Sequence, residues 1–351
     1  MSANDPSARG ETILSIDLGR TATKACVSPD PDQVVLIPSN VAHLTVEDVR
    51  MGSADDEFGD PLLDLWLEYQ GSGYALGRMA WDFGAGLGLG QPKTQDALIK
   101  VLGCAGFFNV NGPVGVIVGL PYESPRGFNE QKAELTKELT ASNPHVLIYR
   151  GRPMSLDISW LRIVPEGYGS LILCESNPTA GEGYFQQRSV AVMDIGHQTT
   201  DFLMVDRFNF ARAVSNSVGF AMSQFYEQVA EKIDGANSQS LDLMEAVHRE
   251  KGHRKFRPKG SNRQTDLDAI LPSLMNSFSQ DLYTRFVEWL PERATDVIVT
   301  GGGGEFFWGN LKPLIEGETG LLAHIATPTR KANALGQYIY GQLNRVTQDR
   351  G

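Results

Sequence analysis

One short pattern occurs twice in this 351-residue sequence, and it constrains the fold more than any other feature. Residues 12–18 form an apolar run that is followed by Gly19 and by a second apolar run at 22–27. Residues 189–194 repeat the arrangement, with Gly196 in the turn. A strand, a glycine turn and a strand form a hairpin signal. Two such units about 180 residues apart indicate an internal duplication.

Hydrophobic periodicity predicts the remaining elements. Short apolar runs between turn residues predict strands at 34–37, 114–120, 146–149, 155–164, 202–205 and 296–300. Helical spacing predicts helices at 94–107 with Thr94 as a candidate cap, 127–141, 169–175, 217–233, 241–250, 267–290 and 330–343. Residues 42–61 are acidic and weakly periodic, and we expect a loop or a small insertion there.

Length and charge limit the class of protein. The chain is long enough for two domains and is 41% hydrophobic, which suffices for two cores. Its net charge of −11 argues against a general nucleic-acid-coating surface. The cysteines are few and widely spaced, which is typical of a reducing compartment. We see no signal peptide, transmembrane run or amphipathic anchor, so we expect a cytoplasmic protein with no membrane partner.

The first hairpin turn carries a set of residues that suits phosphate binding. Gly19 permits a tight turn and close approach of the backbone to a phosphate. Thr21 and Thr23 offer hydroxyl donors, and Lys24 has the length to reach a β- or γ-phosphate. Asp17 is a candidate ligand for hydrated Mg²⁺. The alternative is an ordinary hairpin with a surface lysine.

The second hairpin turn repeats the aspartate, the glycine and the hydroxyls. Asp194 is a candidate metal ligand, and Gly196, His197, Gln198 and Thr199 are candidate phosphate contacts. Two such hairpins are suited to hold a triphosphate from both sides. An ordinary turn histidine is the alternative for His197.

A glycine run and a single glutamate complete the candidate set. Gly301, Gly302 and Gly303 follow the strand at 296–300, so we expect the backbone to approach an adenosine or a phosphate there. The alternative is a flexible turn. Glu166 follows the strand at 155–164, where a carboxylate is able to orient an attacking water. The alternative is a solvated side chain.

In its motifs the sequence resembles the actin-like ATPase superfamily, and most closely its bacterial and archaeal branch of ParM/StbA plasmid-segregation proteins. The resemblance rests on Ile16-Asp17-Leu18-Gly19 with Thr23-Lys24, on 193–201 (MDIGHQTTD), and on 298–303 (IVTGGG). Branch-like segments are 37–39 (IPS), 74–77 (YALG), 119–121 (GLP), 164–167 (VPEG) and 332–336 (ANALG).

The resemblance implies a fold, an activity and partners. It implies an α/β fold of two actin/Hsp70-like lobes with duplicated ribonuclease H-like domains and a nucleotide cleft. It places lobe I at 12–188 with an insertion near 40–70, lobe II at 189–330, and a C-terminal helix at 331–347 packing back on lobe I. It implies hydrolysis of ATP or GTP with Mg²⁺, with Glu166, Asp194 and Asp17 as catalytic residues. It also implies self-assembly into filaments, and a DNA-bound adaptor as a further partner.

Three residues depart from the family pattern. His197 and Gln198 stand where the family often has glycine or threonine, and Arg20, a further candidate nucleotide contact, stands where many members have a small residue. We expect these departures to affect the rate of hydrolysis more than the fold.

The segment 249–259 is basic in an acidic chain. It fits either a contact for an acidic neighbouring subunit, DNA or a DNA-bound adaptor, or a solvated loop.

Three other functions remain open from the sequence. A small-molecule kinase of the same superfamily needs a substrate pocket for which no motif is seen. A chaperone-type ATPase needs a peptide-binding domain that the chain has no room for. A non-hydrolysing scaffold does not need the retained Asp17, Glu166 and Asp194.

Overall fold

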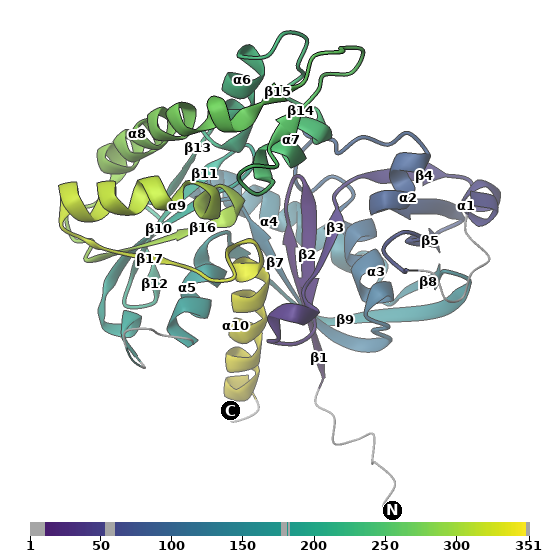
Figure 1. Ribbon diagram of the computed structural model, residues 1–351. Helices are drawn as coiled ribbons and strands as arrows, with labels where there is room; N and C mark the ends of the chain where they lie inside the picture. The colour runs from purple at the N-terminus through teal and green to yellow at the C-terminus, as the bar shows by residue number, and fades with distance from the viewer. Residues whose placement is uncertain (1–10, 53–59, 177–180, 182, 349–351) are drawn as a thin grey trace, which may run out of the picture. The chain divides into compact units, whose positions relative to one another are not determined.

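The computed structural model describes residues 11–52, 60–176, 181 and 183–348, and these residues form two compact units (Figure 1). Of these described residues, those within Met1–Leu120, Arg126–Ile172 and Asn333–Gly351 belong to unit 1. Unit 2 comprises Pro121–Pro125 and Leu173–Ala332. Each unit is built on its own mixed sheet. The domain limits expected from the sequence stay predictions.

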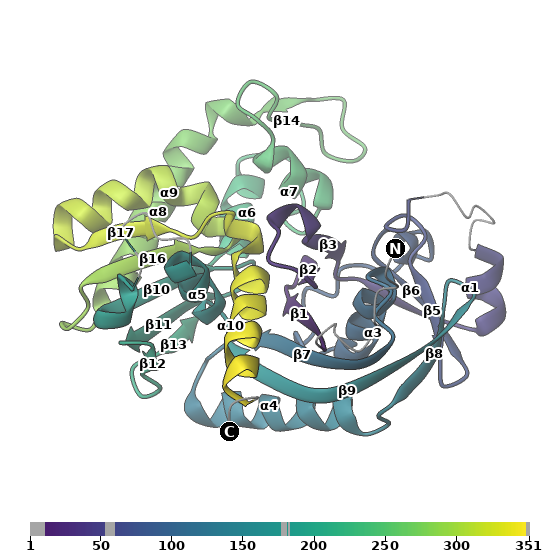
Figure 2. The same cartoon turned by 90° about the horizontal axis from the view of Figure 1, so that it is seen from below.

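Unit 1 contains a nine-stranded sheet in the order β3-β2-β1-β7-β9-β8-β5-β6-β4. In chain order its strands are β1 (Thr12–Leu18), β2 (Ala22–Cys26), β3 (Val35–Pro38), β4 (Val41–Leu44), β5 (Trp66–Tyr69), β6 (Ser72–Leu76), β7 (Gly112–Leu120), β8 (His145–Tyr149) and β9 (Arg152–Pro165). Figure 2 shows β9 as a long curved strand. One end of β9 pairs with β8 and the rest with β7, so this strand joins the two halves of the sheet.

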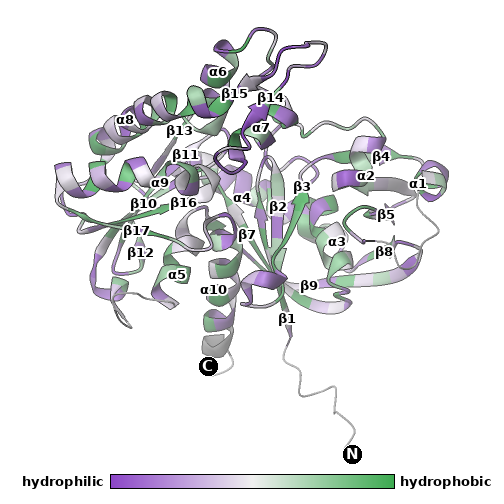
Figure 3. Cartoon of the chain, in the orientation of Figure 1, coloured by the Kyte–Doolittle hydropathy of each residue, from purple (hydrophilic) through white to green (hydrophobic). Residues whose placement is uncertain are grey.

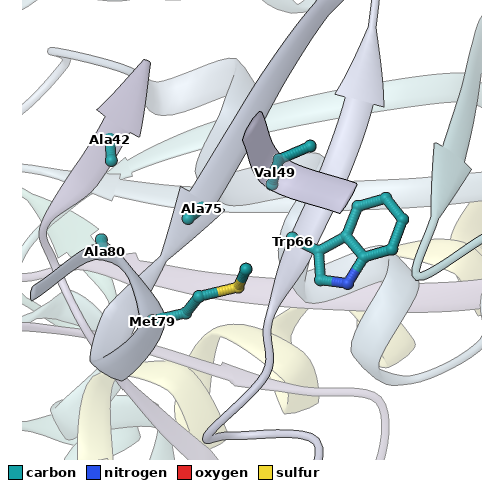
Figure 4. Close-up of a cluster of buried hydrophobic side chains, with 6 residues drawn as sticks. All are labelled: Ala42, Val49, Trp66, Ala75, Met79 and Ala80. Carbon is teal, nitrogen blue, oxygen red and sulfur yellow. The ribbon is translucent and has the colours of Figure 1, made fainter. Parts of the chain in front are cut away.

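The helices of unit 1 are α1 (Val46–Gly52), α2 (Gly77–Asp82), α3 (Ala97–Phe107), α4 (Pro125–Thr140), the first part of α5 (Tyr168–Ser176) and α10 (Ala332–Gln348). The residues of α5 from Leu173 onward belong to unit 2. Strands β1 and β7 are parallel and almost wholly buried, as expected for a central pair whose two faces are both covered. A second apolar cluster lies under β4 and β6 and consists of Ala42, Val49, Trp66, Ala75, Met79 and Ala80 (Figure 4). This cluster binds α1 and α2 to the outer strands.

Unit 2 contains a sheet in the order β12-β11-β10-β16-β17, with β13 paired to β11. Its strands are β10 (Ser189–Ile195), β11 (Thr200–Asp206), β12 (Asn209–Phe210), β13 (Asn216–Val218), β16 (Asp296–Thr300) and β17 (Leu322–Ile325). Its helices are α6 (Met222–Glu231), α7 (Leu241–His248), α8 (Leu271–Trp289) and α9 (Gly301–Leu314), with a π-helical turn at Ile315–Thr319. A small ribbon of β14 (Lys255–Phe256) and β15 (Thr265–Asp266) lies apart from this sheet.

The two units share a central arrangement of three strands. In unit 1, β1 is antiparallel to β2 and parallel to β7. In unit 2, β10 is antiparallel to β11 and parallel to β16. The expected α/β class and the expected repetition of one strand arrangement in the two units are confirmed.

Three expectations about secondary structure are wrong in part. Within 42–61, which we expected to be a loop, the described residues form most of β4 and all of α1, because the side chains of Ala42 and Val49 enter the core; residues 53–59 lie outside the described residues. The helix expected at 217–233 is divided into β13 and α6. Asp96, and not Thr94, precedes the first residue of α3, while the Thr94 carbonyl accepts from Ala97 in the preceding turn.

Candidate functional site

The first hairpin of unit 1 holds a carboxylate and an ammonium side by side. Asp17 and Lys24 are direct partners in the β1–β2 register, and Lys24 Nζ lies 3.0 Å from Asp17 Oδ2. The Asp17 residue is only 5% exposed. A Cβ at Gly19 would collide with the Ala22 carbonyl and lie 2.6 Å from Lys24 Nζ, so only glycine fits this turn.

The rest of this turn is tied to the segment after β3. The Ser39 amide donates to the Thr21 carbonyl over 3.1 Å, and the Ser39 hydroxyl donates to the Gly19 carbonyl. The backbone of the turn is therefore fixed. Thr23 lies within β2 and is buried, so its hydroxyl is placed in the sheet and away from the tip of the turn.

Arg20 is engaged by the protein itself. Its guanidinium donates to the carbonyl of Leu89, at 3.4 Å, and to the carbonyl of Gln91. Both acceptors lie in the segment 83–96 between α2 and α3, which we call the glycine-rich loop because it contains four glycines. Arg20 was expected among the nucleotide contacts. In the structure it links the glycine-rich loop to the β1–β2 turn, which contains Gly19 and which we call the phosphate-type turn.

Glu166 lies in the turn between β9 and α5 and is 4% exposed. Its amide donates to the Leu120 carbonyl over 2.8 Å. The next residue, Gly167, has a φ of 85° and donates its amide to Asn333 Oδ1 at 3.1 Å. Ser170 also donates to Asn333 Oδ1, at 2.9 Å. The turn that carries Glu166 is therefore held by β7 and by the first turn of α10.

Asp17 and Glu166 lie at the same edge of the unit 1 sheet. β7 separates them, because Gly119 is the partner of Asp17 on one side and of Val164 on the other. Two strand spacings of about 4.8 Å separate Asp17 from Val164, and Glu166 lies two residues beyond Val164. Each of the two carboxylates has a lysine partner, since the ammonium of Lys93, in the glycine-rich loop, donates to Glu166 Oε2.

A cavity of about 260 Å³ adjoins these residues within unit 1. Its lining includes Gly19, Arg20, Ser39, Asn40 and Lys93. Lys100, also in the lining, is nearly buried and donates to the Gln95 carbonyl over 2.8 Å. Removal from solvent lowers the pKa of Lys100 below its ordinary value, against the opposing effect of Asp96. The cavity is polar and its lining carries more cations than anions.

The hairpin of unit 2 places two carboxylates opposite each other. Asp194 and Asp201 are direct partners in the β10–β11 register, and they are 5% and 2% exposed. The Gly196 amide closes the turn by donating to the Thr199 carbonyl at 2.9 Å. The Thr199 hydroxyl lies 3.4 Å from Asp201 Oδ2.

The same turn of unit 2 also contacts the start of helix α6. The carbonyls of Gly196 and His197 accept from the amides of Met222 and Ser223 over 3.3 and 2.7 Å. The His197 ring lies 5.9 Å from the ring of Tyr226 on α6. The first amides of α6 are therefore used by the protein's own turn. Gln198 stands at the tip of the same turn.

The glycines at the start of α9 differ in what they approach. Gly301 has a φ of 81°, and a Cβ there would collide with Asp194 Oδ1. A Cβ at Gly303 would collide with Ile195 Cγ2, whereas at Gly302 the nearest atom would be Arg330 Nε at 4.0 Å. Close packing on β10 thus accounts for Gly301 and Gly303, and Gly302 alone faces open space.

An aromatic and basic cluster lies near Gly302 in unit 2. His248 Nε2 lies 2.8 Å from the Tyr226 hydroxyl, and His248 Nδ1 accepts from Arg330 Nη2 at 3.1 Å. Burial, with a smaller effect from Arg330 and Arg254, lowers the pKa of His248 to about 4. His248 is therefore neutral at pH 7, with its proton on Nε2.

The basic segment 249–259 follows this cluster, and Figure 3 shows hydrophilic colour over much of the stretch between α7 and β15. Two of its cations have partners within the segment or beside it. Arg249 and Arg254 bond to the carbonyls of Lys255 and Arg249, and Arg254 lies 3.6 Å from Asp268. These internal contacts favour the solvated-loop interpretation.

Each unit offers one carboxylate that suits a hydrated magnesium ion. Asp17 and Asp194 offer carboxylate oxygens at strand ends, which are hard ligands of the kind Mg²⁺ takes. Among the residues that the structure describes, no group of three or more His, Cys, Asp or Glu side chains is placed to hold a metal. Magnesium typically keeps several waters and takes one or two carboxylates together with substrate phosphates.

Lys93 could not be recognised from the sequence. It stands between Pro92 and Thr94 in a loop without periodicity, and nothing in the local pattern distinguishes it from a surface lysine. Asn333 was found only as part of the branch-like segment 332–336. Its role in holding the Glu166 turn depends on α10 packing against α5, a contact between residues more than 160 positions apart.

Two family models match the chain, and together they span most of it. The model for the actin-like proteins N-terminal domain matches residues 15–169. The model for the archaeal actin homologue MreB-like C-terminal domain matches residues 192–313. A search of curated protein sequences finds no significant match. No helix in the described part of the chain is long and apolar enough to cross a membrane.

Solved structures with the same fold span almost the full chain. A 15-stranded ParM filament from Clostridium botulinum is 17% identical, with a TM-score of 0.67 over 95% of this chain and 100% of that one. The archaeal actin homologue Ta0583 in complex with ADP is 17% identical, with a TM-score of 0.66 over 94% and 99%. The actin-like protein Alp7A is 14% identical, with a TM-score of 0.70 over 96% and 97%.

Proposed function

We propose that this chain, which belongs to the actin-like proteins, is a nucleotide triphosphatase that forms nucleotide-dependent filaments. One observation carries the proposal: Asp17 and Glu166 lie at the same sheet edge, each beside a lysine, and Asp17 is followed by a turn with no room for a side chain at Gly19. This edge combines a turn that suits phosphate binding, a carboxylate that suits a metal ion (Asp17) and a carboxylate that suits the orientation of water (Glu166).

In unit 1, the turn at Gly19 presents backbone and hydroxyl donors to the phosphates, and Lys24 supplies a positive charge. The fixed backbone supports this role, because the Ser39 bonds hold the turn in one conformation before any ligand binds. Thr21 lies in the turn and is partly exposed, so it suits a phosphate contact better than the buried Thr23.

Glu166 is the proposed group that orients the attacking water. Its turn is fixed by Leu120 and by Asn333 through Gly167, so the backbone of Glu166 keeps one position. Phosphoryl transfer depends mainly on positioning and on stabilisation of charge. A side chain on a fixed backbone with nearly no solvent access favours the first requirement.

In unit 2, Asp194, Gly196, Gln198 and Thr199 are the proposed counterparts, and His197 is the residue we expect to modulate the rate. Asp17 and Asp194 are the proposed ligands of a hydrated Mg²⁺. When bound, Mg²⁺ would neutralise charge on the phosphate oxygens.

The nucleoside is assigned to the start of α9, where Gly302 faces open space near Arg330. Gly301 and Gly303 support this position through their packing on β10. The neutral His248 and the Tyr226 hydroxyl lie in the same cluster. Both ATP and GTP are kept as substrates in the proposal.

Self-assembly is proposed from the fold, which is shared with the ParM filament, and from the actin-like family models. Head-to-tail contacts that do not close into a ring propagate as a fibre. By the same reasoning we propose plasmid or DNA segregation in the cytoplasm, with a DNA-bound adaptor as the partner that joins filament and cargo.

The test uses the purified full chain with ATP, GTP and non-hydrolysable analogues, with and without Mg²⁺. Phosphate release, light scattering and negative-stain microscopy are measured across a range of protein concentration and salt. We expect filaments with nucleotide and their loss as nucleotide is hydrolysed. A species that binds nucleotide but stays monomeric under every condition would overturn the assembly proposal. Phosphorylation of a sugar panel would then test the kinase alternative.

A further inference from the structure

We propose that Lys93 is a positioning residue for hydrolysis, and that it holds the Glu166 carboxylate in the orientation that activates water. This inference rests on the proposed function, because it concerns the same sheet edge. It adds a residue that neither the sequence motifs nor the family models assign.

The contact itself is close and sheltered. The Lys93 ammonium donates to Glu166 Oε2, and the two side chains are only 12% and 5% exposed. An exposed lysine loses side-chain freedom for little gain when it pairs with a carboxylate in water. A pair this sheltered is screened much less by solvent and salt, so it restricts the direction of the carboxylate.

The backbone around Lys93 is fixed on both sides. Two residues before it, the Gln91 carbonyl accepts from Arg20, and two residues after it, the Gln95 carbonyl accepts from Lys100. The Gln95 amide donates to the Pro92 carbonyl over 3.0 Å, which forms a turn around Lys93. This part of the glycine-rich loop therefore presents the ammonium from a set position.

The loop also connects Glu166 to the phosphate-type turn. Arg20 is adjacent to Gly19 in the chain and is bonded to the carbonyls of Leu89 and Gln91. Lys93 lines the cavity that Gly19 and Arg20 also line. The position of the glutamate is therefore set, through one short loop, by the segment that is proposed to contact phosphate.

Electrostatics give a second reason for a cation at this position. A carboxylate that is 4% exposed and faces a bound triphosphate is repelled by it, in surroundings that screen charge weakly. The Lys93 ammonium offsets that repulsion and keeps the carboxylate near the phosphate. Without it we expect the carboxylate to turn away, while the phosphate contacts at the Gly19 turn are retained.

The test compares steady-state nucleotide hydrolysis by the full wild-type chain, Lys93→Met, Lys93→Arg, Glu166→Gln and the Lys93→Met/Glu166→Gln double variant. Lys132→Met, an exposed lysine on α4, is the matched control. Thermal unfolding of each variant is recorded first. If Lys93→Met does not fold, Lys93→Gln, which keeps a hydrogen-bond donor without the charge, takes its place.

We expect kcat to fall by roughly 10²-fold in Lys93→Met, the scale seen when a catalytic group is misplaced by about 1 Å. We expect KM to change by less than about 3-fold, since binding energy comes from the turns. Lys93→Arg should recover most of kcat, and Lys132→Met should match the wild type. In the Glu166→Gln background, Lys93→Met should cost nothing further, because both changes remove the same function.

Other results overturn the inference. A wild-type kcat in Lys93→Met, or a rise in KM with kcat unchanged, would show that Lys93 does not act through Glu166. Additive losses in the double variant would give Lys93 an independent role. Absence of turnover by the wild-type chain itself, with nucleotide shown to be bound, would instead remove the proposed hydrolysis and this inference with it.

Discussion

The two hairpins have the same strand pairing, but they place different charges opposite the first aspartate. In unit 1 the partner of Asp17 is Lys24, and the two form an ion pair. In unit 2 the partner of Asp194 is Asp201. A duplicated backbone thus carries one neutral pair and one doubly acidic pair. We propose that this difference gives the unit 1 turn a preference for phosphate oxygens and the unit 2 turn a preference for a cation.

The third strand also differs between the units. At its start, β7 places Val114 opposite Thr12, whereas β16 places Asp296 opposite Val190. Asp296 is fully buried and accepts from Tyr184, Thr295, Arg188 and His324. Unit 2 therefore holds this end of its sheet with a polar network, and unit 1 holds it with apolar packing.

The largest effect is expected from the aspartates themselves. Asp194→Ala should reduce Mg²⁺-dependent turnover by more than about 10³-fold, because it removes the proposed metal ligand. Asp17→Ala should cost less, since it frees Lys24 to bind phosphate. Phosphate release at saturating Mg²⁺ measures both. Asp206→Ala, in an exposed pair with Arg293, is the control. Full turnover in Asp194→Ala would remove the cation role of the unit 2 hairpin.

The second effect concerns the buried network of unit 2. Asp296→Ala should lower the free energy of unfolding by about 3 kcal/mol, because it leaves Arg188 and Tyr184 without their acceptor. Urea unfolding at pH 7 measures it, and Asp206→Ala should change it by less than about 1 kcal/mol. If Asp296→Ala lowered the free energy of unfolding no more than Asp206→Ala does, the buried network would contribute nothing to stability.

The same network predicts a pH dependence. Burial alone would raise the pKa of Asp296, but the bonds from His324, Tyr184 and Thr295 and the charge of Arg188 lower it below its ordinary value. A lowered pKa stabilises the fold above the unfolded-state value of about 3.9, and the contribution is lost as pH falls below it. When the pH is lowered from 5 to below about 3.9, the free energy of unfolding should therefore fall more for the wild type than for Asp296→Ala.

The third effect distinguishes packing from ligand contact among the glycines of α9. Gly301→Ala should lower stability by about 2 kcal/mol, because it combines a positive φ with a collision at Asp194. Gly302→Ala should be neutral or slightly stabilising, since alanine favours a helix and the space is open. Thermal unfolding compares the two. If Gly302→Ala weakens nucleotide affinity at unchanged stability, the nucleoside assignment is strengthened, and unchanged affinity would contradict it.

The smallest effect is expected at Lys24. Lys24→Met should raise the dissociation constant for nucleotide about 10-fold, or about 1.4 kcal/mol, because one phosphate contact is lost. The affinity should also become less dependent on salt, since fewer charges take part. Titration with a fluorescent nucleotide at two salt concentrations measures both, with Lys132→Met as control. Equal salt dependence in the variant and the wild type would show that Lys24 serves only Asp17.

The sequence was sufficient to predict those strands and helices whose hydrophobic pattern is local. The bounds of β1 and β16 agree with expectation because their apolar runs end abruptly at Gly19 and Gly301. The sequence was insufficient for β4 and α1, whose two core residues, Ala42 and Val49, are separated by polar positions. Burial there comes from Trp66 and Met79, which are distant in the chain.

The candidate site shows the same limit. Asp17, Gly19 and Lys24 were recognised together because eight consecutive residues contain them. The partner of Glu166 was not recognised, because Lys93 reaches it across 73 positions of sequence from a loop. Contacts of this kind depend on the sheet order, which local periodicity does not encode.

Helix α10 has a consequence for the order of events during synthesis. Ser15 in β1 bonds to the Ala334 carbonyl, and the Glu166 turn bonds to Asn333. Both partners leave the ribosome only after the whole of unit 2 has been made. The first strands of unit 1 must therefore wait through most of translation before their sheet edge is completed. Closing a contact across 319 positions is slow compared with local helix formation. The nascent chain is thus prevented from completing this edge until α10 is in place.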